Sequence, residues 1–234
     1  MTPRKAGAAR IGQTGRMTRD APHPVSIPLA DGRTVLSGDL APPAPGAGLV
    51  IFAHGSGSSR LSPRNRAVAA GLAGTGLGTL LFDLLTPGEA ADRANVFDIA
   101  LLAGRVAEAV DWARGQPALA GERIGLFGAS TGAAAALVAA AALGNDVGAV
   151  VSRGGRPDLA GEALGTVRAP VLLIVGGADH GVIELNDSAF ARLAFEKRFE
   201  IVPGATHLFE EPGALEAVTR LAADWFASHL AAAD

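Results

Sequence analysis

The stretch GLFGASTGAAAALV, residues 125–138, places one serine, Ser130, where an apolar run gives way to small helix-forming residues. Its centre, GASTG at 128–132, fits the pattern G-x-S-x-G. In that pattern the serine occupies a sharp, strained turn from strand to helix, and its hydroxyl stands exposed above the sheet. The amides that open the following helix favour negative charge at the same place. The stretch therefore predicts a strand at 123–127, a helix at 131–143 and a nucleophile at Ser130.

Apolar runs and helical patterns alternate on both sides of this stretch. Short apolar runs such as LVIFA (49–53) and PVLLIVG (170–176) are typical of strands buried on both faces. The same reading predicts strands at 78–83, 147–152 and 199–202, and helices at 67–74, from Asn95 onward, near 184–196 and from Pro212. We expect Asn95 to cap its helix, and the polar segment 84–94, which contains proline and glycine, to form a loop. The alternation predicts an α/β protein with a mostly parallel central sheet and helices on both faces.

The N-terminal part differs from this pattern. VSIPL (25–29) and TVLSGDL (34–40) flank an Asp-Gly turn, which predicts an antiparallel hairpin. The first 19 residues contain five basic residues and no acidic one. We expect a flexible tail over 1–22, with Met17 as an alternative start, followed by one domain over 23–234, because 234 residues suit a single large domain.

Composition limits the classes of function. A net charge of −3 gives no reason to expect nucleic acid or an anionic membrane as partner. The absence of cysteine excludes disulfides and thiolate metal sites, and no histidine pair has metal-ligand spacing, so we expect neither metal nor cofactor. The longest strongly apolar stretch, 133–143, is too short to span a bilayer, and no signal-peptide core is present. We therefore expect a cytoplasmic location.

A serine hydroxyl is a weak nucleophile and needs a base that a carboxylate orients. Asp179 follows the predicted strand at 170–176, and His207 follows the next one, so the chain order is serine, acid, histidine. Because the carboxyl ends of parallel strands share one edge of a sheet, we expect all three side chains to converge there. Asp158, after the preceding strand, stays open as an alternative acid.

A fourth element of such a site is a pair of amides that hold the oxyanion. HGSG at 54–57 follows the strand at 49–53, and we assign the Ser56 amide there, paired with the Thr131 amide. His54 is interpreted as a structural brace of this loop. Arg60 and Arg153 also follow strands near this edge, and guanidinium groups suit carboxylates and phosphates. Both are candidate substrate-binding residues, with a solvated surface role as the alternative.

The segments FAHGSGSSR, FGASTGA, GGADHGV and GATHLFEEPG together resemble the α/β-hydrolase superfamily, within it the dienelactone-hydrolase-like group, over about 24–230. They are similar to serine-nucleophile relatives that are sometimes fused to phosphoribosyltransferase domains. The resemblance implies the α/β-hydrolase fold and a triad of Ser130, Asp179 and His207. Dienelactone hydrolase itself uses a cysteine nucleophile, which this chain lacks, so dienelactone does not follow as the substrate.

These features predict a serine hydrolase that cleaves a small carboxylic ester or lactone through an acyl-enzyme, with an anionic group on the substrate if the arginines bind it. A thioesterase, an acyltransferase or a small peptidase would use the same triad. A non-catalytic binding protein on a hydrolase scaffold is the alternative from another class. A homodimer, and a phosphoribosyltransferase partner suggested by family analogy, also stay open.

Overall fold

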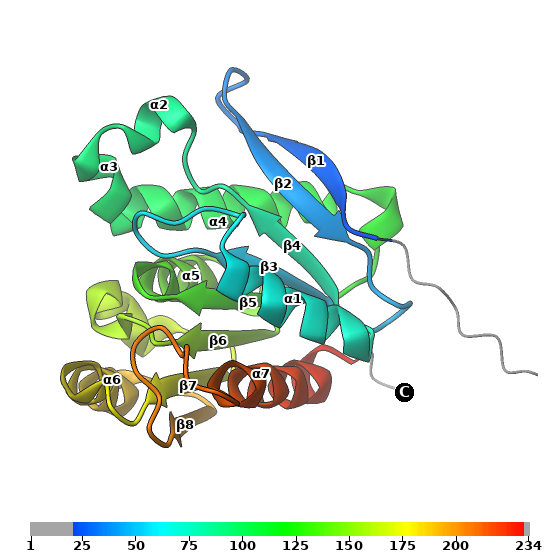
Figure 1. Cartoon of the computed structure of the whole chain (residues 1–234). Coiled ribbons are helices and arrows are strands. Elements are labelled where there is room, and N and C mark those ends of the chain that lie inside the picture. Colours follow the sequence, from blue (N-terminus) through cyan, green and yellow to red (C-terminus); the bar gives the residue numbers. More distant parts are fainter. Residues whose placement is uncertain (1–20, 232–234) are drawn as a thin grey trace, which may run out of the picture.

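The structure, a computed structural model, describes residues 21–231, so all but the last two residues of the tail predicted over 1–22 lie outside the described residues. Eight strands form one sheet in the order β1-β2-β4-β3-β5-β6-β7-β8 (Figure 1). The strands are β1 (His23–Pro28), β2 (Val35–Ala41), β3 (Leu49–Ala53), β4 (Gly78–Phe82), β5 (Ile124–Ala129), β6 (Ala149–Arg153), β7 (Val171–Gly176) and β8 (Lys197–Val202). β2 pairs antiparallel with β1 and β4, and every other pair is parallel.

Helices cover both faces of this sheet (Figure 1). On one face α1 (Pro63–Thr75) packs beside α7 (Ala214–Leu230). On the other lie α4 (Ile99–Arg114), α5 (Thr131–Leu143) and α6 (His180–Arg192). The short helices are α2 (Pro87–Ala90), α3 (Arg93–Phe97) and the 3-10 helices η1 (Pro117–Leu119), η2 (Gly144–Asp146) and η3 (Pro157–Thr166). The predicted architecture is confirmed: a mostly parallel sheet with an N-terminal antiparallel hairpin and helices on both faces.

The central strands bury both faces, as their continuous apolar runs predict. Phe52 on β3 and Phe127 on β5 pack with ring centroids 4.8 Å apart on the face that α1 and α7 cover. On the other face the alanines of α5 are almost all fully buried, because small side chains let this helix approach both the sheet and α4. The alanine run thus serves close packing. Within residues 21–231, no helix combines the length and the apolar character needed to cross a bilayer.

Two expectations about local structure were wrong. The single helix predicted from Asn95 is interrupted at Asp98, which separates α3 from α4 and caps α4 by accepting a hydrogen bond from the Leu101 amide. The segment 84–94, predicted as a loop, contains α2, which Thr86 caps. In both places a polar side chain satisfies the free amides of a new helix start, and apolar periodicity does not register this interaction.

Candidate active site

Ser130 occupies the turn between β5 and α5 with φ 52° and ψ −125°. A positive φ is rare for residues other than glycine. Hydrogen bonds hold this strained turn on both sides. The Ser130 carbonyl accepts from the amides of Ala133 at 3.1 Å and Arg156 at 3.0 Å, and the Ser130 amide donates to the Arg153 carbonyl at 3.3 Å. The backbone strain is therefore fixed by the surrounding chain, as is common for residues at functional sites.

Both glycines of the motif are required by close backbone contacts. A Cβ atom at Gly128 would overlap the backbone of Ala133, across the turn. A Cβ atom at Gly132 would overlap the carbonyl oxygens of Ala53 and His54, at the end of the neighbouring strand β3. The glycines thus let the nucleophile turn sit directly against the loop that follows β3.

His207 and Asp179 come from the loops after β8 and β7, and the structure brings them into direct contact. The His207 Nδ1 atom donates to Asp179 Oδ2 at 2.7 Å, which leaves Nε2 as the free nitrogen of the ring. Backbone bonds join the two loops, since the amides of Gly177 and Ala178 donate to the carbonyls of Val202 and Ala205. This pairing of loops explains why residues 28 positions apart meet.

Asp158, the alternative acid, lies in η3 and is held elsewhere. Its two carboxylate oxygens accept from Arg156, at 2.9 Å from Nε and 2.8 Å from Nη2. A bidentate pair of this kind fixes the carboxylate. Of the two candidate acids, Asp179 is the one that contacts a histidine.

Ser130 and His207 line the same cavity, which has a volume of about 270 Å³ and which we call the nucleophile cavity. The other residues that line it are Gly55, Ser56, Ser58, Ser62, Arg64, Asn65, Ala129, Arg153, Gly154 and Leu208. None of these is acidic, and two are arginines. Within the described range the Ser130 hydroxyl makes no hydrogen bond, and it faces this cavity. The structure therefore groups the three predicted residues, with Asp179 behind His207.

The loop after β3 lies against the nucleophile. A Cβ atom at Gly55 would lie 2.9 Å from Ser130 Cβ. The Ser56 amide, predicted to hold the oxyanion, donates to the Thr131 side-chain oxygen at 2.8 Å. Thr131 opens α5, so its own amide is one of the free amides of a helix start. One of the two predicted donors is thus already engaged in this structure.

His54 hydrogen-bonds both to its own loop and to the segment that follows β4. Its Nε2 atom accepts from the Leu84 amide at 3.1 Å, so Nδ1 carries the proton and donates to the Gly55 carbonyl at 3.0 Å. Burial lowers the pKa of His54, which favours the neutral ring that these two bonds need. The contacts agree with the interpretation of His54 as a brace.

The two candidate arginines have different surroundings. Arg153 ends β6 beside Ala129 of β5, is 6% exposed and lines the nucleophile cavity. Its Nη2 donates to Asn65 at 3.2 Å, its guanidinium lies over the Phe209 ring, and its buried Nε has no partner among the described residues. Burial, with a smaller effect of Arg64, lowers the pKa of Arg153 to about 10.

Arg60 instead lies in a second cavity on the other side of the β3 loop. Its Nη1 donates to Asp83 at 2.7 Å, and Asp39 lies 3.6 Å from its Nε. Asn65, which α1 adds to the nucleophile cavity together with Arg64, was not identified from the sequence, because no local motif marks it. Over residues 21–231, no group of three or more histidine or acidic side chains could hold a metal ion.

Comparison with known proteins places this geometry in a family. The model described as "Dienelactone hydrolase family" matches residues 40–230. The chain belongs to the dienelactone hydrolase family. A dienelactone hydrolase from Anabaena variabilis, known from a crystal structure, is 53% identical to it, with a TM-score of 0.86 over 90% of this chain and 98% of that one. This family member is therefore a hydrolase of the α/β type.

Two further comparisons add context. A Mycobacterium tuberculosis protein that carries the name of a phosphoribosyl transferase is 58% identical over 204 residues, which are 87% of this chain and 46% of that protein. The chain thus spans about half the length of the curated relatives it matches first. Est1E from Butyrivibrio proteoclasticus, 18% identical with a TM-score of 0.73 over 88% of this chain and 98% of that one, shares the fold.

Proposed function

We propose that this family member is a serine hydrolase that cleaves a carboxylic ester or lactone through an acyl-enzyme. One observation carries the proposal: Ser130 and His207 line one cavity, while Asp179 accepts the hydrogen bond of the other imidazole nitrogen. Serine, histidine and carboxylate in this relation form the arrangement that activates a hydroxyl for attack on a carbonyl carbon.

In this mechanism His207 Nε2 removes the proton of the Ser130 hydroxyl as its oxygen bonds to the carbonyl carbon. The carbonyl electron pair moves onto oxygen, and Asp179 stabilises the imidazolium that forms. Collapse of this intermediate breaks the bond to the leaving oxygen, which takes the proton from His207. A water molecule then gives a proton to His207 and attacks the acyl carbon. The bond between this carbon and the Ser130 oxygen breaks, the Ser130 oxygen takes the proton back from His207, and the acid is released. The Ser130 and His207 side chains have to come within hydrogen-bond reach when substrate binds.

The oxyanion would face the Thr131 amide at the start of α5. The Ser56 amide is the second proposed donor, and the Thr131 hydroxyl holds it beside the nucleophile until the substrate oxygen competes for it. Removing one such donor typically costs about 2.7–4 kcal/mol of transition-state stabilisation. Because Gly55 has no Cβ atom, the loop after β3 lies directly against Ser130, which keeps the Ser56 amide close to the nucleophile.

A fluorophosphonate probe tests the nucleophile directly. We expect labelling of the wild type at Ser130, no labelling of Ser130→Ala, and a loss of about 10⁴-fold in kcat for Asp179→Asn. Asp158→Asn is the matched control and should keep its activity. Folded wild-type protein that does not label would favour a binding protein, and an inactive Asp158→Asn beside an active Asp179→Asn would reassign the acid. Matched esters, thioesters and amides of one acid would define the leaving group.

We further propose that the substrate carries one negative charge that binds Arg153. An unpaired buried cation is costly, and among residues 21–231 no carboxylate lines the nucleophile cavity to offset it. Arg64, the second arginine there, is paired with Glu210 at 3.1 Å, which leaves Arg153 as the uncompensated charge. Arg60 keeps its bonds to Asp83, so the anion is assigned to Arg153 alone.

Two esters that differ by one carboxylate test this assignment, phenyl butyrate and 3-carboxyphenyl butyrate. A hydrogen bond to a charged group contributes about 1.5–3 kcal/mol, so Arg153→Met should raise KM for the carboxylate ester by about 10- to 150-fold. The KM for the neutral ester should change little. Arg60→Met is the matched control, and its effect on KM should be the same for the carboxylate ester and the neutral ester. Equal effects on both esters in Arg153→Met would overturn the assignment.

A phosphoribosyltransferase partner stays a prediction that copurification would test.

A further inference from the structure

A second cavity, of about 390 Å³, lies on the other side of the loop after β3. It shares Gly55, Ser56 and Ser58 with the nucleophile cavity, so the two meet at the loop that would hold the substrate carbonyl. Most of its remaining wall is apolar, and we call it the apolar cavity. Its apolar lining residues are Leu61, Leu84, Leu85, Pro87, Ala90, Val96 and Leu102. The volume lies within the range of small-molecule pockets.

We propose that the apolar cavity binds the acyl chain of the substrate, an inference that rests on the proposed serine hydrolase function. The leaving oxygen has to lie beside His207, which must protonate it, and His207 lines the nucleophile cavity but not the apolar cavity. The alcohol part and its charge therefore occupy the side of His207 and Arg153. The acyl part is left for the other side of the loop, where apolar side chains face it.

This assignment defines a substrate class: an ester between an acid with an apolar chain and an alcohol that carries one negative charge. Of the described residues that line the apolar cavity, only Arg60 and Asp83 are charged, and they neutralise each other in an ion pair of 2.7 Å. Because that pair has no net charge, an apolar chain meets no uncompensated charge there. The two cavities thus differ in charge as the two halves of such an ester do.

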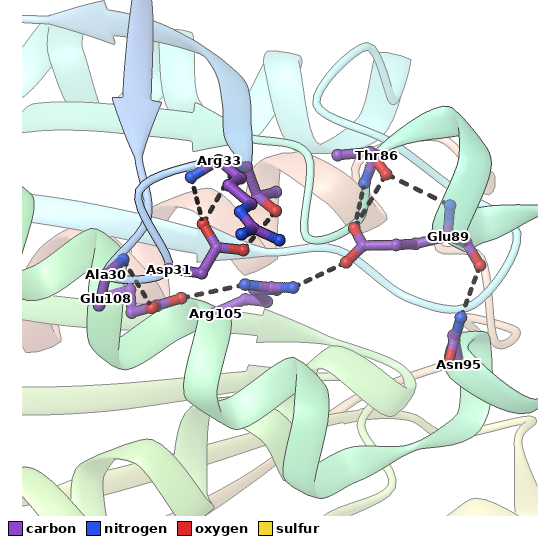
Figure 2. Close-up of polar contacts among 9 residues, drawn as sticks. Ala30, Asp31, Arg33, Thr86, Glu89, Asn95, Arg105 and Glu108 are labelled. Carbon is purple, nitrogen blue, oxygen red and sulfur yellow. Dashed lines mark hydrogen bonds and ion pairs between the residues drawn. The ribbon is translucent and has the colours of Figure 1, made fainter.

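Polar contacts hold one wall of the apolar cavity in place. This wall, which we call the roof, consists of Pro87 and Ala90 of α2 and Val96 of α3, yet neither helix contains a buried residue. Figure 2 shows Glu89 at the centre of the contacts that hold them. Its carboxylate accepts from the Thr86 amide at 2.8 Å and from Arg105 of α4 at 2.7 Å, while its carbonyl accepts from Asn95 at 3.0 Å. Glu89 therefore links α2 to α4 through its side chain, and α2 to α3 through its backbone carbonyl.

Arg105 extends this network to the N-terminal hairpin. Its other terminal nitrogen donates to Glu108 at 3.2 Å, and Glu108 accepts from the amide of Ala30 in the hairpin turn at 3.1 Å (Figure 2). The Arg105 side chain is only 13% exposed, so the pair with Glu89 is screened from water better than a surface pair. Glu89 and Arg105 are thus positioning residues that set the shape of the apolar cavity without touching substrate.

Chain-length profiles test the cavity. For p-nitrophenyl esters from acetate to octanoate, we expect kcat/KM of the wild type to rise about fourfold per methylene until the cavity is full. Ala90→Trp, in the lining, should remove this rise. Ala91→Trp is the matched control and should keep the rise, because Ala91 is also exposed but does not line the cavity. A flat wild-type profile, or an unchanged profile in Ala90→Trp, would overturn the proposal.

Two isomeric esters decide which half of the substrate enters. Ethyl hexanoate carries its long chain on the acyl side, and hexyl acetate carries it on the alcohol side. We expect the wild type to prefer ethyl hexanoate, and Ala90→Trp to lose that preference. A preference for hexyl acetate that Ala90→Trp removes would instead assign the alcohol chain to this cavity and overturn the proposal.

The positioning role has its own readout. Arg105→Gln should flatten the chain-length profile while acetate turnover is kept, and Arg105→Lys should restore part of the slope. An unchanged profile in Arg105→Gln would show that the pair does not hold the roof. Fluorophosphonate labelling of every variant distinguishes failure of the proposed function from failure of this inference. Wild-type protein that does not label would overturn the serine hydrolase function. Labelled protein with a flat chain-length profile would overturn only the assignment of the acyl chain to the apolar cavity.

Discussion

At Gly132 the nucleophile turn approaches β3 so closely that a single methyl group decides whether the site can form. We expect Gly132→Ala to lower the free energy of unfolding by about 1–3 kcal/mol, the usual cost of overpacking, and to abolish turnover, because its Cβ would overlap the Ala53 carbonyl. Gly104→Ala is the control, since a Cβ there meets nothing within 4 Å in the middle of α4. Helix propensity predicts that this control gains about 0.5–1 kcal/mol. Urea denaturation measures both values, and a Gly132→Ala variant as stable as wild type would contradict the close approach.

His54 gives the fold a predictable dependence on pH. Burial lowers its pKa below the ordinary value of 6.5, so below pH 6.5 the unfolded chain binds a proton that the folded chain does not. The free energy of unfolding should therefore fall as the pH decreases from 6.5 toward the folded-state pKa, with a slope of at most about 1.4 kcal/mol per pH unit. Above pH 6.5 this contribution is constant.

The variant His54→Gln supplies the control, because it keeps a polar side chain in the loop but cannot titrate. We compare the unfolding free energies of wild type and His54→Gln from pH 8 to pH 5. Their difference should be constant above pH 6.5, and below pH 6.5 the wild type should lose stability relative to His54→Gln. Parallel curves over the whole range would show that the buried imidazole does not retain its low pKa.

At the scale of elements, apolar patterning predicted the strands better than the helix boundaries. Strands such as β3 and β7 are apolar along their whole length, so the pattern identifies them without knowledge of their neighbours. The junction of α3 and α4 has apolar residues at helical spacing on both sides, and the break depends on where one carboxylate bonds. Asn95, predicted to cap this helix, donates instead to Glu89. A sequence does not show which of several polar residues reaches a free amide.

The cap at Asp98 is a measurable part of this junction. Asp98→Ala removes the hydrogen bond to the Leu101 amide and should lower the free energy of unfolding by about 1 kcal/mol. Asp98→Asn keeps an oxygen acceptor in the same place and should stay close to wild type. Thermal or urea denaturation distinguishes the two variants. Equal losses in both would indicate that the charge of Asp98, rather than its hydrogen bond, stabilises the start of α4.

At the scale of the whole molecule, sequence reasoning predicted the grouping of the candidate site residues, because topology alone brings them together. Ser130, Asp179 and His207 each follow a parallel strand, so strand order places them at one sheet edge. The different surroundings of Arg60 and Arg153 could not be predicted in this way. They depend on Asp83 from the end of β4 and Asn65 from α1, which are contacts between distant segments.

The chain contains two tryptophans, one on each face of the sheet, and they can test whether residues 23–234 unfold as one domain. Trp112 lies in α4, and Trp225 lies in α7 on the opposite face. Leu230→Ala should cost about 2–5 kcal/mol, because Leu230, the last residue of α7, is fully buried against Gly48 and Gly125.

If the sheet couples its two faces, this change must also shift the unfolding of the distant α4. In the Trp225→Phe background only Trp112 fluoresces, so we expect Leu230→Ala to lower its urea midpoint by the same amount as the midpoint from far-UV circular dichroism. Val35→Ala, at a position that is 53% exposed, is the control and should shift neither midpoint. If the Trp112 midpoint does not change while the circular dichroism transition splits in two, the two faces unfold separately. The loss of packing at Leu230 in α7 would then not be transmitted to α4 through the shared strands.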